Sequence, residues 1–182
     1  MSYPALETDR LSIRPYRDED APRVLDIMSR IEVVRWLSTP PFRLMADLEE
    51  ALAWVARRHD LEAQEPATIF RAIVPHETGV VAGSVLVAPL VRLDGGHVGE
   101  FELGWHLHPD SEGHGWATEA GAALARQAFD AGHDELVIDM YPDNHGSARV
   151  ARRLGARDQG VGPDPWYGDE GLVFRLSADD LA

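Results

Sequence analysis

Two glutamates and a histidine lie on one face of a predicted strand, and side chains of these types can accept protons. In residues 100–108 apolar and polar side chains alternate, which is typical of a β-strand with one buried face. Glu100, Glu102 and His106 share the polar face with Gly104. Burial raises the pKa of a carboxyl group toward neutrality, where a carboxylate serves well as a general base. We therefore expect acid–base chemistry at this strand.

A glycine-rich turn and a helix follow this strand, and together they predict a site for an anion. Pro109 ends the strand because it has no N–H to donate. Gly113 and Gly115 follow, and from Ala117 onward apolar residues recur at helical spacing. The first N–H groups of a helix have no acceptor within it and carry the positive end of its dipole. Glycines let a phosphate approach these groups closely, so residues 113–118 are expected to bind phosphate.

Two common phosphate-binding loops do not fit this turn. The mononucleotide loop, GxxxxGK followed by Ser or Thr, occurs nowhere in the chain. The dinucleotide turn, GxGxxG, fails because Thr118 stands where its third glycine should be. A nucleotide-binding domain is therefore disfavoured.

The turn and the preceding strand resemble motifs of the GNAT superfamily of acyl-CoA-dependent N-acyltransferases. Residues 112–117 look like its pyrophosphate loop, and residues 113–120 are similar to the branch that acetylates the N-termini of ribosomal proteins. Residues 102–107 are similar to that branch's strand, which reads Glu, aliphatic, Gly, aromatic, any residue, Leu. Glu112 departs from the pattern, because the superfamily often has Arg or Gln there and a carboxylate disfavours a neighbouring diphosphate.

A second resemblance lies at residues 144–155. Asn144 and Ser147 follow an expected strand and open a helix that ends at Gly155, as in the superfamily's second cofactor motif. Many members place a Tyr seven residues after this Asn as the acid for the leaving thiolate, but Ala151 stands there. The ribosomal-protein branch instead has Ser at the position of Ser147, and its hydroxyl can hydrogen-bond the thiolate. The alternative interpretation is that Asn144 only caps the helix and Ser147 lies in its first turn.

The resemblance implies acetyl-CoA as the cosubstrate and assigns roles to individual residues. Glu102 is the first choice for the base that takes a proton from the amine, and Glu100 is the second. Ser147 is the group expected to hydrogen-bond the thiolate, with Tyr141 and Tyr167 as alternatives. Otherwise Glu102 only pairs with an arginine or caps a neighbouring backbone group.

The strand and the two motifs supply the expected contacts with acetyl-CoA. These residues are Trp105, His106 and Leu107 on the strand, Gly113, His114, Gly115, Trp116, Ala117 and Thr118 in the turn, and Asn144 and Ser147 in the second motif. Trp105 and Leu107 would contribute backbone groups, and a backbone N–H in this stretch would stabilise the tetrahedral oxyanion. His106 alternatively shapes the pocket.

Periodicity along the chain predicts an α/β class fold, a mixed sandwich made of a single domain, residues 1–182. The expected strands cover residues 10–16, 68–74, 80–90, 100–108, 136–140, 157–161 and 172–176. The expected helices begin near residues 18, 44, 117 and 144, which gives the order β-α-α-β-β-β-α-β-α-β-β. The resemblance implies a GNAT-like mixed, mostly antiparallel sheet with helices on both faces. It also implies an acceptor pocket beside the first two helices, lined by Trp36, Phe42 and Trp54 unless these are plain core.

Composition limits the partners and the location. There are 31 acidic and 17 basic residues, and the net charge of −14 disfavours nucleic acid and anionic membranes. The charge favours a cationic substrate such as an amine, unless it serves solubility alone.

No cysteine is present, which excludes disulfides and thiolate chemistry and suits the cytoplasm. No apolar run approaches the ~20 residues that span a bilayer. His106 and His108 share a strand face, but no further ligand spacing supports a metal site, so no metal is expected.

These observations together predict an N-acetyltransferase that moves an acetyl group from acetyl-CoA to a primary amine by direct attack in a ternary complex. The acceptor is either a protein N-terminus or a small-molecule amine. The alternative is a CoA-binding module or sensor without turnover, which Glu112 and Ala151 support. Many relatives pair as homodimers, although no stretch of this sequence indicates one.

Overall fold

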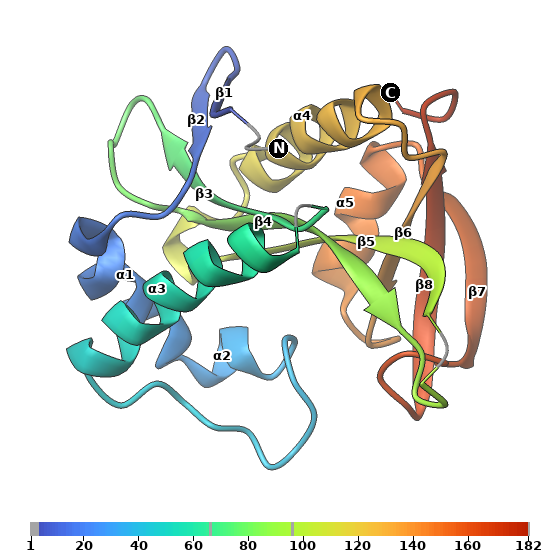
Figure 1. The fold of residues 1–182 in the computed structure, drawn as a ribbon, viewed down its shortest axis with the longest axis horizontal. Coiled ribbons are helices and arrows are strands. Elements are labelled where there is room, and N and C mark those ends of the chain that lie inside the picture. The colour runs from blue at the N-terminus through green and yellow to red at the C-terminus, as the bar shows by residue number, and fades with distance from the viewer. Residues whose placement is uncertain (1–3, 66, 96, 182) are drawn as a thin grey trace.

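An eight-stranded sheet organises the chain (Figure 1). The computed structural model describes residues 4–65, 67–95 and 97–181, with the side chains of residues 97 and 98 excepted. The strand order is β1-β2-β3-β4-β5-β6-β8-β7, and every neighbouring pair is antiparallel except β5 and β6. The strands are β1 (Leu6–Glu7), β2 (Leu11–Arg14), β3 (Ile69–Pro75), β4 (Gly83–Val91), β5 (His97–Leu107), β6 (Glu135–Met140), β7 (Arg157–Pro163) and β8 (Glu170–Ser177).

Helices cover both faces of the sheet (Figure 1). They are α1 (Ala21–Met28), α2 (Ile31–Val34), α3 (Leu48–Gln64), α4 (Trp116–Asp130) and α5 (His145–Arg153), with single 3₁₀ turns η1 (Asp18–Asp20) and η2 (Pro109–Ser111). The helices α1, α2 and α3 pack on one face, and α4 and α5 pack on the other. None of the helices in the described part of the chain is long and apolar enough to cross a bilayer.

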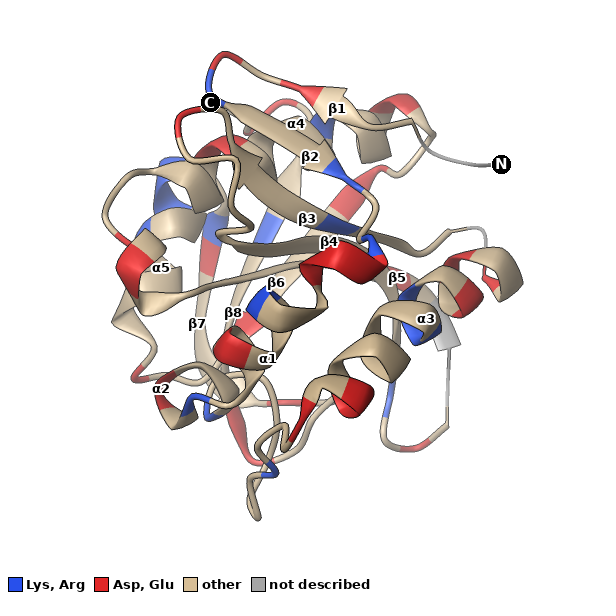
Figure 2. Cartoon of the chain, turned by 90° about the vertical axis from the view of Figure 1, so that its left-hand side faces the viewer, with Lys and Arg blue, Asp and Glu red and all other residues tan. Residues whose placement is uncertain are grey.

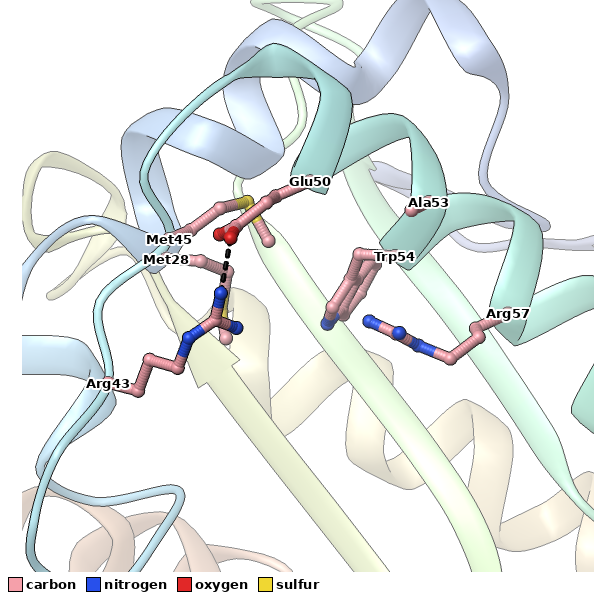
Figure 3. Close-up of a pocket in the computed structure, with 7 residues that line it drawn as sticks. All are labelled: Met28, Arg43, Met45, Glu50, Ala53, Trp54 and Arg57. Carbon is pink, nitrogen blue, oxygen red and sulfur yellow. Dashed lines mark hydrogen bonds and ion pairs between the residues drawn. The ribbon is translucent and has the colours of Figure 1, made fainter.

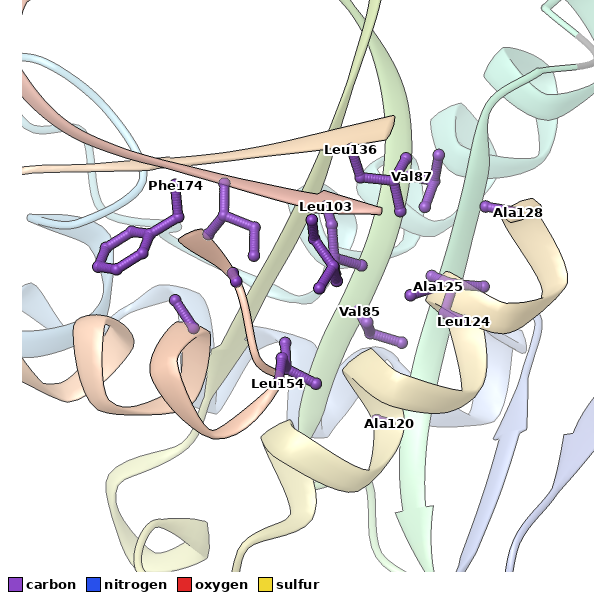
Figure 4. Close-up of a cluster of buried hydrophobic side chains, with 14 of the residues drawn as sticks. Val85, Val87, Leu103, Ala120, Leu124, Ala125, Ala128, Leu136, Leu154 and Phe174 are labelled. Atoms are coloured by element: carbon purple, nitrogen blue, oxygen red, sulfur yellow. The ribbon is translucent and has the colours of Figure 1, made fainter. Parts of the chain in front are cut away.

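The larger core lies between the sheet and helices α4 and α5 (Figure 4). Val85 of β4 and Leu103 of β5 point toward Leu124 of α4, and all three are essentially excluded from solvent. Because side chains alternate along a strand, Glu102, Gly104 and His106 must then lie on the opposite face, toward α1 and α3. The alternation that buries one face of β5 against α4 therefore places its polar side chains on the face covered by α1 and α3.

The smaller core lies under α1 and α3 and is built around aromatic side chains. Tyr16, Trp54 and Phe70 pack against one another, with ring centroids 5.1 Å apart for Tyr16–Trp54 and 5.3 Å for Trp54–Phe70. Edge-to-face contacts of this kind add to the stabilisation that burial alone provides. These contacts pack α3 against the sheet face that carries Glu102.

The structure confirms the predicted fold class and changes some element boundaries. The second predicted helix begins at Leu48 rather than near residue 44, because Asp47 caps it by accepting a hydrogen bond from Glu50 N–H at 2.9 Å. The short elements β1 and α2 are additions that periodicity did not predict. Gly155 follows the end of α5 with φ of 87°, the left-handed conformation that commonly terminates a helix.

Ion pairs link the ends of several strands and helices. All 17 residues counted as lysine or arginine in the sequence are arginines. Arg175 of β8 contacts Glu100 at 2.8 Å and Glu135 at 2.6 Å, which links β5, β6 and β8. Arg10 of the β1–β2 hairpin contacts Glu119 of α4 at 2.6 Å. Figure 2 shows acidic and basic positions along the ribbon, with acidic positions in the majority. These pairs hold the strand ends beside the site described next.

Candidate active site

The pairing of the two parallel strands β5 and β6 is limited to the position of Glu102 in the described part of the chain. Within the described residues their ladder contains one register pair, Glu102 with Val137. On its other side β5 stays paired with β4 up to Leu107. The main-chain groups of residues 103–107 that point toward β6 therefore have no strand partner there. Such groups need acceptors and donors from elsewhere, and a ligand that lies between the strands can supply them.

The turn before α4 presents backbone donors to open space. Gly113 and Gly115 both have left-handed backbone conformations, with φ of 84° and 81°. A Cβ atom added at Gly113 would meet no atom within 4 Å. In the part of the chain that the structure describes, the N–H groups of residues 113–118 donate to no protein acceptor. The turn therefore has free backbone donors at the residues where the sequence predicts a phosphate site, and anion binding there stays a prediction.

Arg10 and the neighbouring side chains fix this turn from outside. The Arg10 guanidinium donates to the carbonyl oxygen of His114 at 3.0 Å and pairs with Glu119. The His114 and Trp116 rings are stacked with centroids 4.3 Å apart. Glu112 is exposed, so its carboxylate remains hydrated beside the turn. These side chains thus hold the backbone donors of the turn in place and leave the space in front of the donors open.

Glu102, the first candidate for the base, contacts a tyrosine rather than an arginine. Its Oε2 accepts a hydrogen bond from the Tyr167 hydroxyl at 2.8 Å. Burial raises the pKa of the Glu102 carboxyl above its ordinary value, and the Tyr167 hydrogen bond offsets part of this shift. A carboxylate with a raised pKa is a stronger base than a hydrated one, so the environment of Glu102 suits proton abstraction.

Glu100, the second candidate, is held in ion pairs. Its carboxylate lies 2.8 Å from Arg175 and 3.6 Å from Arg92. Its partners are thus charged guanidinium groups, whereas the partner of Glu102 is a neutral hydroxyl. The structure therefore separates the two glutamates, which the sequence pattern alone could not do.

His106 is part of a buried chain of hydroxyl groups. Its Nε2 lies 3.1 Å from Ser84 Oγ, and Ser84 Oγ lies 2.6 Å from the Tyr16 hydroxyl. Burial, with a smaller contribution from the charge of Arg58, lowers the pKa of His106 to about 4. The imidazole is thus neutral at pH 7 and too weakly basic to deprotonate an ammonium group. The role of His106 in shaping the pocket and its contact with acetyl-CoA both remain predictions.

Asp139 is a feature of the site that sequence reasoning missed. It is partly buried on β6, and its Oδ1 is buried without a hydrogen-bond partner among the described residues. Burial and the negative charges of Asp164 and Glu102 raise the pKa of Asp139 to about 7. Asp139 lies on the same face of β6 as Val137, the register partner of Glu102, so its surroundings depend on which strands become neighbours.

Asn144 caps α5, and Ser147 lies in its first turn. The Asn144 Oδ1 accepts a hydrogen bond from Ser147 N–H at 3.1 Å. The capping interpretation is thus confirmed, and it leaves the Asn144 amide NH₂ group for a ligand. The described residues provide no hydrogen-bond partner for the Ser147 hydroxyl. The contacts of both residues with acetyl-CoA remain predictions.

The histidines expected to lie on one strand face have separate surroundings. His108 is buried and lies 3.1 Å from Asp26 and 2.7 Å from Asp110. His106 faces Ser84, and His114 stacks on Trp116. No group of three or more His, Cys, Asp or Glu residues that could hold a metal ion occurs among the described residues.

A hollow of about 300 Å³ opens between α1, α3 and the loop before α3 (Figure 3). It is lined by Met28, Arg43, Met45, Glu50, Ala53, Trp54 and Arg57. Of the three aromatic residues predicted to line an acceptor pocket, only Trp54 lines this hollow. Trp36 instead lies against Tyr141, with centroids 6.3 Å apart, and Phe42 is exposed outside it.

Comparison with known proteins places this geometry in context. A family model described as an acetyltransferase (GNAT) domain matches residues 10–157. The uncharacterized N-acetyltransferase YoaA of Bacillus subtilis (strain 168) is 26% identical over 160 residues, which are 87% of this chain and 86% of that protein.

Two solved structures have the same fold. The acetyltransferase from Agrobacterium tumefaciens str. C58 is 30% identical, with a TM-score of 0.73 over 97% of this chain and 95% of that chain. The ribosomal L7/L12 α-N-protein acetyltransferase RimL, solved in complex with coenzyme A, is 18% identical, with a TM-score of 0.75 over 97% of this chain and 99% of that chain.

Proposed function

Because the chain belongs to the GNAT acetyltransferase family, we propose that it transfers an acetyl group from acetyl-CoA to a primary amine by direct attack in a ternary complex. The observation that carries this proposal is the juxtaposition of two features. Residues 113–118 offer backbone donors with no protein acceptor, and they follow directly on the strand that bears Glu102.

The coenzyme would lie between β5 and β6, with its diphosphate at the turn. The N–H groups of residues 113–118 would bind the diphosphate, and the free main-chain groups of residues 103–107 would pair with the pantetheine amides. RimL, which shares the fold, was solved with coenzyme A bound. Asn144 would contribute its amide NH₂ group to the same ligand. When bound, acetyl-CoA supplies the activated acyl group.

Glu102 would remove a proton from the acceptor. An alkylammonium titrates near ~10, so it must be deprotonated before its nitrogen can attack. Glu102 takes this first proton, directly or through water. The amine nitrogen then bonds to the thioester carbonyl carbon, the C–S bond breaks, and the second proton passes from the nitrogen to the leaving thiolate to give the thiol of CoA. A backbone N–H near Trp105 to Leu107 would stabilise the oxyanion, and the Ser147 hydroxyl would hydrogen-bond the leaving thiolate.

The acceptor is a protein N-terminus or a small-molecule amine. The motifs at residues 102–107 and 113–120 favour the branch that acetylates ribosomal proteins. The net charge of −14 opposes docking on an RNA-rich particle and so favours a small or isolated acceptor. The cytoplasm is the proposed location, because the chain contains no cysteine.

The test combines a binding measurement with a turnover measurement. Titration calorimetry with CoA should show binding, and a thiol-release assay with acetyl-CoA should show turnover with at least one member of an amine panel. CoA binding without release for any amine would favour the sensor alternative. A chain that binds neither CoA nor acetyl-CoA would contradict the proposal altogether.

A further inference from the structure

Arg58 is a cation that α3 holds over the sheet face bearing Glu102. Its guanidinium carbon lies 4.2 Å from the centroid of the Trp54 ring and 4.6 Å from that of Phe70. Its Nε is buried and has no hydrogen-bond partner among the described residues. The two rings are nearly perpendicular, with an interplanar angle of 82°, so contact with both restricts the position of the guanidinium. Its N–H groups stay available to another partner.

No carboxylate in the described part of the chain lies within 4 Å of Arg58. Helix geometry offers Glu62 as its i+4 partner, but that carboxylate pairs with Arg71 and accepts the Phe70 N–H at 2.7 Å. The neighbouring Arg57 adds a second positive charge. In a chain with 31 acidic and 17 basic residues, a partly buried cation without a counter-charge is unexpected. Such a cation is stabilised when an anion binds to it.

The register of the sheet relates Arg58 to the candidate active site. Phe70 of β3 pairs with Leu86 of β4, and Leu86 pairs with Gly104 of β5. The ring under the guanidinium therefore lies two strands from Gly104, about 10 Å away at the usual strand spacing. Glu102 is two residues further along β5 on the same face. An acceptor bound between Arg58 and Glu102 would lie over Leu86 and Gly104.

The geometry points to an acceptor that is a small amine bearing an anionic group, carboxylate or phosphate, which Arg58 binds while the amine faces Glu102. A guanidinium binds both groups through paired N–H donors. This inference names the substrate class of the proposed function and rests on it. The net charge of the chain would by itself favour a cationic acceptor. The inferred acceptor also carries an anionic group, because Arg58 is a local positive charge within this acidic chain.

The test compares amines that differ only in the anion. The probes are β-alanine, 4-aminobutyrate and 6-aminohexanoate, their carboxamides, and O-phosphoethanolamine with ethanolamine as its neutral match. Binding to the CoA-loaded protein is measured by calorimetry, and acetylation is measured by mass spectrometry. We expect at least one anionic member to bind about 10- to 100-fold more tightly than its neutral match, the effect typical of a hydrogen-bonded charge pair.

Variants assign this preference to Arg58. Arg58→Met keeps an unbranched apolar stem against Trp54 and should remove the preference, and Arg58→Lys should restore part of it. Arg17→Gln is the matched control, because it removes one positive charge at an exposed residue paired with Glu19. Thermal unfolding establishes that each variant is folded.

The outcomes separate the two proposals. Acetylation of amines with no preference for the anion, or a preference that survives in Arg58→Met, overturns this inference and leaves the proposed function intact. An Arg58-dependent preference in binding without acetylation supports the anion site and contradicts the proposed transfer. Failure of every anionic probe to bind overturns the inference.

Discussion

Glu102 and Glu100 differ in their partners rather than in their chemistry, and this difference predicts different mutant phenotypes. Glu102→Gln keeps the shape of the side chain but cannot take a proton, so kcat should fall about 10²- to 10⁴-fold. The affinity for CoA should stay unchanged, because the diphosphate turn is untouched. Steady-state kinetics and calorimetry check both expectations.

Glu100→Gln is the matched control for this prediction. It removes a carboxylate from the ion pairs with Arg175 and Arg92 and should lower the unfolding temperature. Its kcat should stay within a few-fold of the wild-type value. Equal losses of kcat in the two variants would argue that neither glutamate is a specific base.

Asp139 predicts how stability depends on pH. The folded protein keeps a proton on this carboxyl up to about pH 7, whereas the unfolded chain loses it near 3.8. The folded state thus binds more protons in this window, and stability should fall as the pH rises from about 4 to 7, by at most ~1.4 kcal/mol per pH unit. Partial solvent exposure reduces this slope. Asp139→Asn should flatten it, as measured by urea unfolding at several pH values, and an unchanged slope would contradict the assignment.

At the scale of elements, the turn before α4 can be tested with a pair of glycines. Gly113 and Gly79 both have positive φ, 84° and 65°, and an added Cβ meets no atom within 4 Å at either position. Changing either to Ala should cost about 1 kcal/mol in backbone strain. Only Gly113→Ala places a methyl group beside the donors expected to bind diphosphate, so it should weaken CoA binding about 10-fold or more.

Calorimetry with CoA and urea unfolding distinguish the two effects. Gly79 lies in the turn between β3 and β4, so Gly79→Ala should lose stability but keep its CoA affinity. If both variants bound CoA equally well, the turn would not be the diphosphate site.

The elements were largely predictable from sequence, and their partners were not. Alternation in residues 100–108 predicted β5 and the face of Glu102, because the period of a strand is a local property. The contact with Tyr167 could not be predicted, since it joins residues 65 apart in sequence. The buried Asp139 and the unpaired Arg58 depend in the same way on which strands and helices become neighbours. Short elements such as β1 and α2 were missed because two to four residues carry too little periodicity.

At the scale of the whole molecule, the net charge of −14 acts against an anionic cosubstrate. Salt screens the repulsion between the protein and acetyl-CoA, so kcat/KM for acetyl-CoA should rise with ionic strength. We expect roughly a 2- to 10-fold increase between about 0.01 and 0.15 M salt, over which the Debye length falls from ~30 to ~8 Å.

The control for this prediction is acetyl-pantetheine, which carries the same thioester without phosphates. Its kcat/KM should be nearly independent of salt, because a neutral molecule is not repelled. A fall in kcat/KM for acetyl-CoA with added salt would indicate that local positive groups, rather than the overall charge, govern its approach.

The ion pairs of the described residues use arginine or histidine and never lysine, and this has a consequence for experiments on the reaction pathway. A guanidinium does not act as a nucleophile toward thioesters, and the chain offers neither a lysine ε-amine nor a cysteine thiol. Radiolabelled acetyl groups would therefore not accumulate on side-chain amines as background. Label recovered on an internal peptide after rapid quenching would report an acyl-enzyme intermediate, and its absence there would favour one-step transfer between the two substrates.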